Sequence, residues 1–288
     1  LETLYADTDS IEPLIALLGE RLKLAKDDER PGILQRLAEW TQKSAGPEAS
    51  MHWWKELLWE RPDHSAARLA VSELLDLDET AETAAGLLEP IFQREEDWTG
   101  LVRVLASRAQ REPDAAQSVA LWMRLASLRE TELADASGAF DAYAKALHAA
   151  PERRDVLRGL ERMAETSERW SDLSEALERL VVVLEIPSRQ AELLVRLGEI
   201  YEGRLGRADR AIDSLRKALQ LDEENRSVLK ALRRLYMQAG QNEPLLEMTR
   251  RLALLARRPL EARELWAAVQ SLCTELGDQA GMLEATRK

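Results

Sequence analysis

The residues with the widest chemical range in this 288-residue chain are three histidines and one cysteine. His52, His64 and His148 fall on different predicted helices, and none has a partner at the spacing that binds a metal ion. Cys273 has no second cysteine with which to form a disulfide or a thiolate zinc site. We therefore expect no metal site, and we expect Cys273 to be a small buried residue.

Catalytic motifs are absent from the sequence. No Gly-x-Ser-x-Gly element marks a nucleophile. The glycines within residues 198–206 follow no strand, so they form no phosphate-binding loop. The acidic run 27–29 lacks the glycine turn and the ligand spacing of a calcium loop. The sequence predicts a protein that is not an enzyme and that binds no cofactor.

The net charge of −12 narrows the range of partners. Nucleic acids and anionic membrane surfaces are bound by clusters of Lys and Arg, which an acidic chain disfavours. A basic or neutral protein partner suits the charge better. The longest apolar run, residues 180–184, is far shorter than the roughly 20 residues of a membrane span. We expect no membrane insertion; the compartment stays open, with the cytoplasm favoured over the periplasm.

Two pairs of basic residues have a spacing that can bind a carboxylate. Arg158 and Arg162 are four residues apart, which places them on one face of a helix. Lys230 and Arg234 repeat this pair 72 residues later. Such a pair can hold an acidic segment or a C-terminus through charge-assisted hydrogen bonds. The alternative is that these cations pair with glutamates of neighbouring helices and add little stability.

Three tryptophans lie close together before residue 60. Trp54 takes a core position in the helical pattern, whereas Trp53 and Trp59 do not fit together on one narrow face. One of them is expected to be exposed, where it would serve as an interface anchor. The alternative is that they pack against a helix predicted near residues 81–94.

The elements that must position these side chains repeat at a spacing of 72 residues. Residues 98–101, Trp-Thr-Gly-Leu, match residues 170–173, Trp-Ser-Asp-Leu. Within each unit, apolar residues recur every three or four positions, and short breakers containing Gly or Pro separate the periodic stretches. Four helices in each unit make two helix hairpins, so the predicted fold is all-α. The best-defined unit has predicted helices over 189–204, 208–221, 226–239 and 242–256.

The hairpins resemble the tetratricopeptide repeat (TPR). The matching residues are Leu194, Leu197, Gly198 and Tyr201 on a first helix, and Ala139, Tyr143, Ala146 and Pro151 on a second. The resemblance implies a right-handed α-α superhelix, an α-solenoid of antiparallel hairpins whose small residues let the paired helices approach closely. It is similar to the long, degenerate arrays of bacterial TPR proteins.

The resemblance also implies a binding surface. In TPR arrays the first helix of each hairpin lines a concave groove that binds a partner protein or peptide. Some family members clamp a peptide carboxylate with an asparagine, and this chain has none at the matching places. With the tryptophans added, the candidate partner-binding residues are Arg124, Arg158, Arg162, Arg196, Glu199, Glu202, Lys230, Arg234, Trp53 and Trp59.

The expected organisation is one continuous TPR-like solenoid over residues 1–288. Residues 1–64 hold N-terminal repeats, and residues 97–288 hold the regular double repeats. Between them, residues 65–96 break the register, which indicates an inserted helix near 81–94. The repeat pattern starts and stops partway through a hairpin. We therefore expect an excerpt of a longer solenoid, or else ends that partners or self-association cover.

The pattern favours a non-catalytic protein–protein interaction scaffold. The alternative is a regulatory or sensory module of a larger multidomain signalling protein or enzyme. RNA binding by helical repeats is a third option, which the acidic charge and the lack of a basic stripe disfavour.

Overall fold

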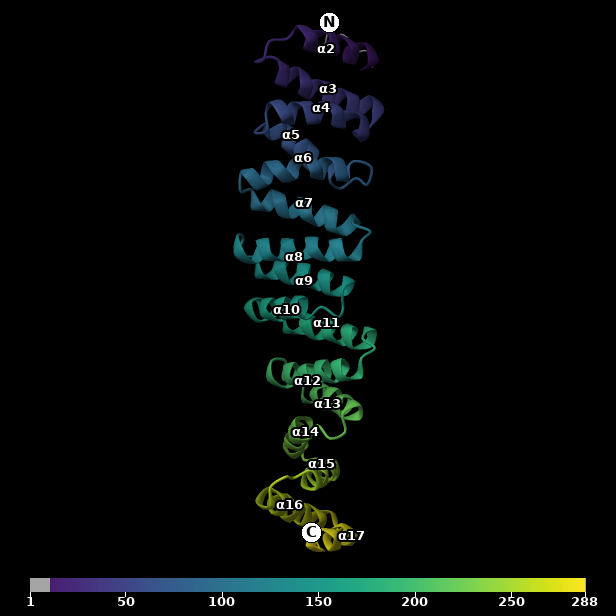
Figure 1. Cartoon of the computed structure of the whole chain (residues 1–288), viewed down its shortest axis with the longest axis vertical. Coiled ribbons are helices and arrows are strands. Elements are labelled where there is room, and N and C mark those ends of the chain that lie inside the picture. The colour runs from purple at the N-terminus through teal and green to yellow at the C-terminus, as the bar shows by residue number, and fades with distance from the viewer. Residues whose placement is uncertain (1–10, 288) are drawn as a thin grey trace. The chain divides into compact units, whose positions relative to one another are not determined.

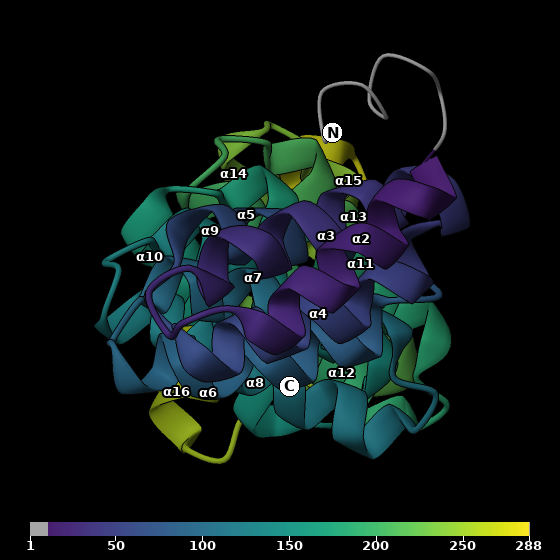
Figure 2. The ribbon, with the colours of Figure 1, turned by 90° about the horizontal axis from the view of Figure 1, so that it is seen from above.

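The computed structural model describes residues 11–287, and every regular element in this range is a helix. Figures 1 and 2 show these helices from two directions at right angles. The chain divides into two compact units, of which unit 1 ends at Met163 and unit 2 starts at Ala164, within α10 (Arg154–Ser167). The all-α prediction is confirmed. One continuous, right-handed solenoid over the whole chain stays a prediction, and its first ten residues lie outside the described range.

In unit 1, each helix from α2 to α9 packs against the next one along the chain. The tight hairpins α3–α4 and α8–α9 have the most extensive packing. The helices are α2 (Ile11–Leu24), α3 (Arg30–Ala45), α4 (Pro47–Glu60), α5 (Ser65–Leu74), α6 (Ala81–Arg94), α7 (Trp98–Arg111), α8 (Ala115–Thr131) and α9 (Ala136–Ala149).

In unit 2, each helix likewise packs against the next, and α12 and α13 form the tightest hairpin. The four helices predicted for the best-defined unit are α12, α13, α14 and α15. Each predicted start and end lies within two residues of the observed one. The helices are α11 (Trp170–Val183), α12 (Pro187–Gly203), α13 (Ala208–Leu221), α14 (Arg226–Gln238), α15 (Asn242–Leu254), α16 (Pro259–Leu276) and α17 (Gln279–Arg287).

Local residues set where the helices begin. The Asp97 carboxylate accepts a hydrogen bond from the backbone N–H of Gly100 (2.9 Å), and Asp135 caps α9 in the same way. These side chains satisfy amides that have no partner inside the helix. Helices α3, α4, α12 and α16 instead carry a proline in their first turn, where its missing N–H costs nothing.

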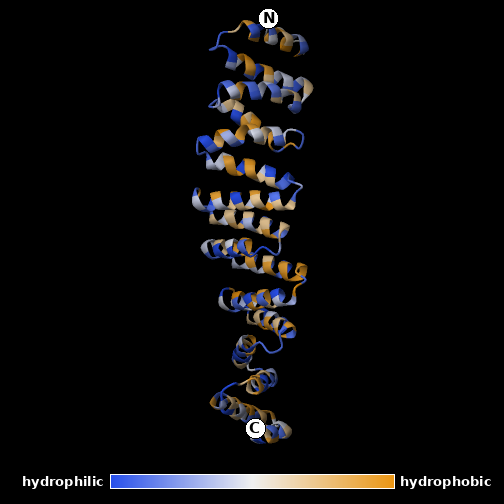
Figure 3. Ribbon diagram, viewed as in Figure 1, coloured by the Kyte–Doolittle hydropathy of each residue, from blue (hydrophilic) through white to orange (hydrophobic). Residues whose placement is uncertain are grey.

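Each helix buries one apolar stripe. Figure 3 shows apolar and polar residues alternating along the helices. In α14, Leu229, Leu232, Leu235 and Tyr236 are buried, and the charged residues between them are exposed or half-buried. This arrangement is the amphipathic period expected from the sequence.

Small residues bring the two helices of a hairpin together. A Cβ atom at Gly198 would lie 2.8 Å from Cγ of Leu215, so α13 packs directly against the α12 backbone. Between successive hairpins of unit 1, the Tyr143 ring of α9 likewise occupies the space where a Cβ at Gly159 of α10 would lie. The chain therefore forms TPR-like hairpins, in which a large side chain of one helix fills the space left by a glycine of another.

Two helices, α5 and α6, lie between α4 and α7. Two buried hydroxyls fix the connection between them. Thr80 donates to the Leu74 carbonyl (2.7 Å), and Ser107 of α7 donates to the Leu75 carbonyl (2.9 Å). The helix expected near 81–94 is present as α6, while α5 is shorter than its neighbours.

Candidate functional site

The histidines are held in separate places. His64 caps α5, because its Nδ1 accepts a hydrogen bond from the amide of Ala67 (3.3 Å). The His52 ring meets Trp53 edge-on, with 4.8 Å between the ring centroids. Within residues 11–287, no three His, Cys, Asp or Glu side chains are grouped to hold a metal ion. In the same range, no helix is long and apolar enough to cross a membrane.

Cys273 is fully buried in α16, as expected from the sequence. Burial raises the pKa of its thiol, and the nearby Asp278 carboxylate raises it further. Both effects favour the neutral thiol over the thiolate.

The candidate charged residues lie on the first helices of the hairpins. The first-helix face of unit 1 contains Arg124 of α8 with Arg158 and Arg162 of α10. The first-helix face of unit 2 contains Arg196, Glu199 and Glu202 of α12 with Lys230 and Arg234 of α14.

On the first-helix face of unit 1, Arg162 forms a two-pronged ion pair with Glu130 of α8. Its Nε and Nη2 atoms lie 2.9 Å and 2.7 Å from the two carboxylate oxygens. The hydrogen bond from Arg162 lowers the pKa of Glu130. The Tyr143 hydroxyl donates to the same carboxylate at 3.4 Å. Arg162 is therefore held by the preceding first helix.

On the first-helix face of unit 2, Arg234 repeats this arrangement 72 residues later. Its Nη2 lies 2.7 Å from Glu202 of α12, which is the preceding first helix. Both arginine side chains remain about half exposed, at 53% for Arg162 and 55% for Arg234. The same ion pair is thus built into both units.

A third ion cluster engages Arg124. Glu89 of α6 contacts both Arg108 of α7 and Arg124 of α8, each at 2.6 Å. Burial acts to raise the pKa of Glu89, but the hydrogen bonds from Arg124 and Arg108 outweigh burial and lower it. Arg124 is therefore tied to the carboxylate that joins three helices.

Two candidate cations keep the greatest freedom. Arg158 forms no ion pair with any residue of the described chain and is exposed. Lys230 lies 3.9 Å from Glu261, whose carboxylate is already held by Arg226 at 2.5 Å. Arg196 pairs with Glu199 one turn away on the same helix (3.0 Å). The alternative of pairing with glutamates of neighbouring helices thus describes Arg162, Arg234 and, at the longer distance of 3.9 Å, Lys230, but not Arg158.

The three tryptophans of α4 differ in solvent exposure, as the helical pattern indicates. Trp54 is 2% exposed and belongs to the core, whereas Trp59 is 86% exposed. Trp53 is half-buried beside His52. The structure therefore exposes Trp59 at the end of α4.

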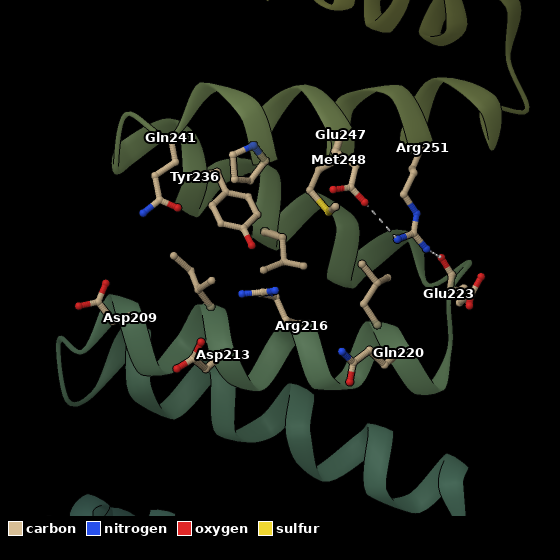
Figure 4. A pocket seen from close by; sticks show the side chains of 14 residues that line it. Asp209, Asp213, Arg216, Gln220, Glu223, Tyr236, Gln241, Glu247, Met248 and Arg251 are labelled. Carbon is tan, nitrogen blue, oxygen red and sulfur yellow. Dashed lines mark hydrogen bonds and ion pairs between the residues drawn. The ribbon is translucent and has the colours of Figure 1, made fainter.

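One feature of unit 2 was missed by the sequence analysis. A groove of about 540 Å³ lies between the second helices α13 and α15, and side chains of α14 also line it (Figure 4). The repeat pattern does not reveal it, because Arg216, Tyr236 and Met248 stand where the sequence 72 residues earlier has alanines. The replacement of these small repeat residues by large ones is the feature of the sequence that could have indicated the groove.

The sequence matches no protein-family model and no curated protein. Solved structures that are similar include MamA, with 14% identity over 57% of this chain and 91% of that chain, at a TM-score of 0.36. Pseudomonas aeruginosa PilF has 17% identity over 75% of this chain and 90% of its own, also at 0.36. YrrB, described as a TPR protein with an unusual peptide-binding site, has 15% identity over 73% and 96%, again at 0.36. The description of this chain as TPR-like rests on its own hairpins.

Proposed function

We propose that this chain is a non-catalytic scaffold that binds a partner protein or peptide on its first-helix faces. Helical-repeat architectures bind partners over extended surfaces made by successive repeats. The faces are exposed and carry charged side chains from consecutive first helices, which suits the recognition of a polar segment.

The observation that carries the proposal is the state of Arg158 and Lys230. These residues occupy equivalent positions, 72 residues apart, and each lies one turn before an arginine that is already paired. Both are exposed, and neither is held closely by a carboxylate. Each unit therefore has one cation, Arg158 or Lys230, that can bind a carboxylate of a partner. It lies one turn before an arginine that already forms an ion pair within the chain.

This arrangement favours a partner segment that carries carboxylates. A side-chain or C-terminal carboxylate can form charge-assisted hydrogen bonds with Arg158 or Lys230 without breaking the paired arginines. The exposed indole of Trp59 is of the kind enriched at protein interfaces, but it ends α4, the second helix of the hairpin α3–α4, so it would be a separate contact in unit 1.

The test is a charge reversal with a matched control. We expect the double variant Arg158→Glu/Lys230→Glu to lose a partner that the wild type captures from the native lysate, as identified by mass spectrometry. The control is Arg179→Glu/Lys217→Glu, which makes the same charge change on exposed residues of the second helices α11 and α13. Circular dichroism checks that both variants keep their helicity.

Retention of the same partners by both double variants would show that the first-helix faces are not the binding surface. Loss from both variants to an equal extent would show that net charge, and not position, decides binding.

A further inference from the structure

We propose that the groove between α13 and α15 is a second binding site, which takes a peptide segment carrying a Lys or Arg side chain. The groove lies entirely within unit 2 and is open along the second helices (Figure 4). Its floor is apolar, formed by Ile212, Leu219, Leu232, Met248 and the ring of Tyr236.

The hydroxyl of Tyr236 is available to a ligand. Only 5% of the residue is exposed, its side chain points into the groove, and its hydroxyl makes no hydrogen bond with any residue from 11 to 287. The hydroxyl faces the open groove and not the core, so a ligand in the groove can reach it. Tyr143 and Tyr201 differ, because their hydroxyls donate to Glu130 and Glu178.

This hydroxyl is a hydrogen-bond donor at neutral pH. Burial raises the pKa of Tyr236 above its ordinary value. The carboxylates of Glu247 and Asp213 raise it further, and the guanidinium of Arg216 opposes them. A ligand atom that accepts a hydrogen bond, such as a peptide carbonyl, satisfies it.

The walls of the groove carry excess negative charge. Four carboxylates line it, against two guanidinium groups; the charged residues are Asp209, Asp213, Glu223, Glu247, Arg216 and Arg251. Arg251 is engaged, because it donates to the Glu223 carbonyl (2.6 Å) and lies 4.0 Å from Glu247. Its guanidinium group therefore already has acceptors within the chain.

Asp209 and Asp213 form the acidic end of the groove. They are four residues apart on α13 and so face the same way, and neither forms an ion pair with the described part of the chain. Two unpaired carboxylates side by side attract a cation. Arg216, on the next turn, makes no hydrogen bond within residues 11–287. Its N–H groups can therefore donate to an acceptor on a ligand.

A basic peptide segment satisfies all these groups together. Its ammonium or guanidinium group pairs with Asp209 and Asp213, and the alkyl stem covers the apolar floor. Its backbone carbonyls accept hydrogen bonds from Tyr236 and Arg216. A simple anion would leave the two aspartates unpaired, and a simple cation would leave the two donors unused.

The groove is specific to this copy of the repeat. Arg216, Tyr236 and Met248 correspond to Ala144, Ala164 and Ala176 in the sequence 72 residues earlier. The donors and the large apolar floor residue are therefore additions to the repeat, and not parts of its common framework.

The site is independent of the first-helix face of unit 2. At about 100° per residue, Leu232 and Tyr236 point to the side of α14 roughly opposite Lys230 and Arg234. Variants on one face therefore leave the other intact, and the two proposals can fail separately.

The test uses the full chain and three fluorescein-labelled hexapeptides, Gly-Ser-Leu-Xaa-Leu-Gly-amide, in which Xaa is Arg, norleucine or Glu. Fluorescence anisotropy gives the affinities. We expect the Arg peptide to bind about 5-fold or more tightly than the norleucine peptide, and the Glu peptide to bind most weakly. Tyr236→Phe should weaken Arg-peptide binding about 5-fold, the effect of one hydrogen bond.

Charge and position are tested with further variants. Asp209→Asn/Asp213→Asn should abolish the preference for Arg over norleucine. Tyr201→Phe is the matched control, because it removes a hydroxyl outside the groove. Arg158→Glu/Lys230→Glu should leave binding of the Arg peptide unchanged, since it alters only the first-helix faces.

Several results would overturn the proposal. These are the absence of Arg-peptide binding at millimolar concentration, tighter binding of the Glu peptide, and an affinity that neither Tyr236→Phe nor the aspartate variant changes. Loss of the Arg peptide in Arg158→Glu/Lys230→Glu would place the peptide on the first-helix face instead.

Discussion

Glu89 illustrates how a single residue can join several helices. Its side chain is only 15% exposed, and its two oxygens meet Arg108 and Arg124 from the next two helices. Desolvation opposes the charged form of this carboxylate, and two guanidinium groups restore it. Removing this carboxylate leaves the charges of both arginines without their partner. Losing one member of a partly buried ion pair lowers stability, because the remaining charge is desolvated and no longer compensated.

We therefore expect Glu89→Gln to lower the free energy of unfolding by about 1–2 kcal/mol. The measurement is a urea titration followed by circular dichroism. Glu175→Gln serves as the control, because its pair with Arg179 is exposed and lies within one helix, and should change stability by less than about 0.5 kcal/mol. Equal effects in the two variants would contradict a bridging role for Glu89.

At the scale of elements, the hairpin α12–α13 depends on a close approach of two helices. Leu215 of α13 lies over Gly198, where a Cβ atom would come within 2.8 Å of it. Overpacking of this kind forces side chains out of their rotamers or moves the backbone. The glycine is thus required by packing between helices, although it weakens the helix it belongs to.

We expect Gly198→Ala to destabilise the chain by about 1–3 kcal/mol, measured as a lower urea midpoint. Gly203→Ala is a matched control in the same helix, because a Cβ there meets nothing within 4 Å. That control should be neutral or stabilise the chain by up to about 1 kcal/mol. A stabilising effect of Gly198→Ala would show that the two helices can separate without loss.

At the scale of the whole molecule, carboxylates that are ion-paired in both units respond to acid. The pKa is lowered for Glu89 and Glu130 in unit 1, and for Glu261 in unit 2, in each case through hydrogen bonds from arginine. A lowered pKa means that the folded chain binds fewer protons than the unfolded chain. Stability from these groups is complete above the ordinary glutamate value of 4.5 and is lost as the pH falls through the folded values.

We expect the melting temperature to fall steeply between about pH 5 and pH 3, and to change little between about pH 6 and pH 7. The double variant Glu89→Gln/Glu130→Gln should show a shallower fall in a series of thermal melts across this range. If its slope equals that of the wild type, other carboxylates cause the acid sensitivity.

Much of the fold could be predicted because it depends on local spacing. Helical periodicity, breakers and the 72-residue repeat place α12 to α15 within two residues of their bounds. The same period identifies core residues such as Trp54 and Cys273, since a residue on the apolar stripe is buried wherever the stripe packs.

The pairing of the candidate site residues was less predictable. The repeat showed that Arg162 and Arg234 are equivalent, but not that each meets a glutamate 32 residues earlier in the chain. The choice between a free and a paired arginine depends on how two helices lie side by side and on which rotamers can reach across them.

The sequence by itself determined the helices, the hairpins, the repeat and the positions of the exposed charges, because each follows from a period of three to four residues or from a fixed repeat. Only the tertiary structure decided which of those charges are neutralised, leaving Arg158 unpaired and Lys230 loosely held. It alone also showed the groove over Tyr236, because that groove combines side chains from three helices whose separation no local pattern encodes.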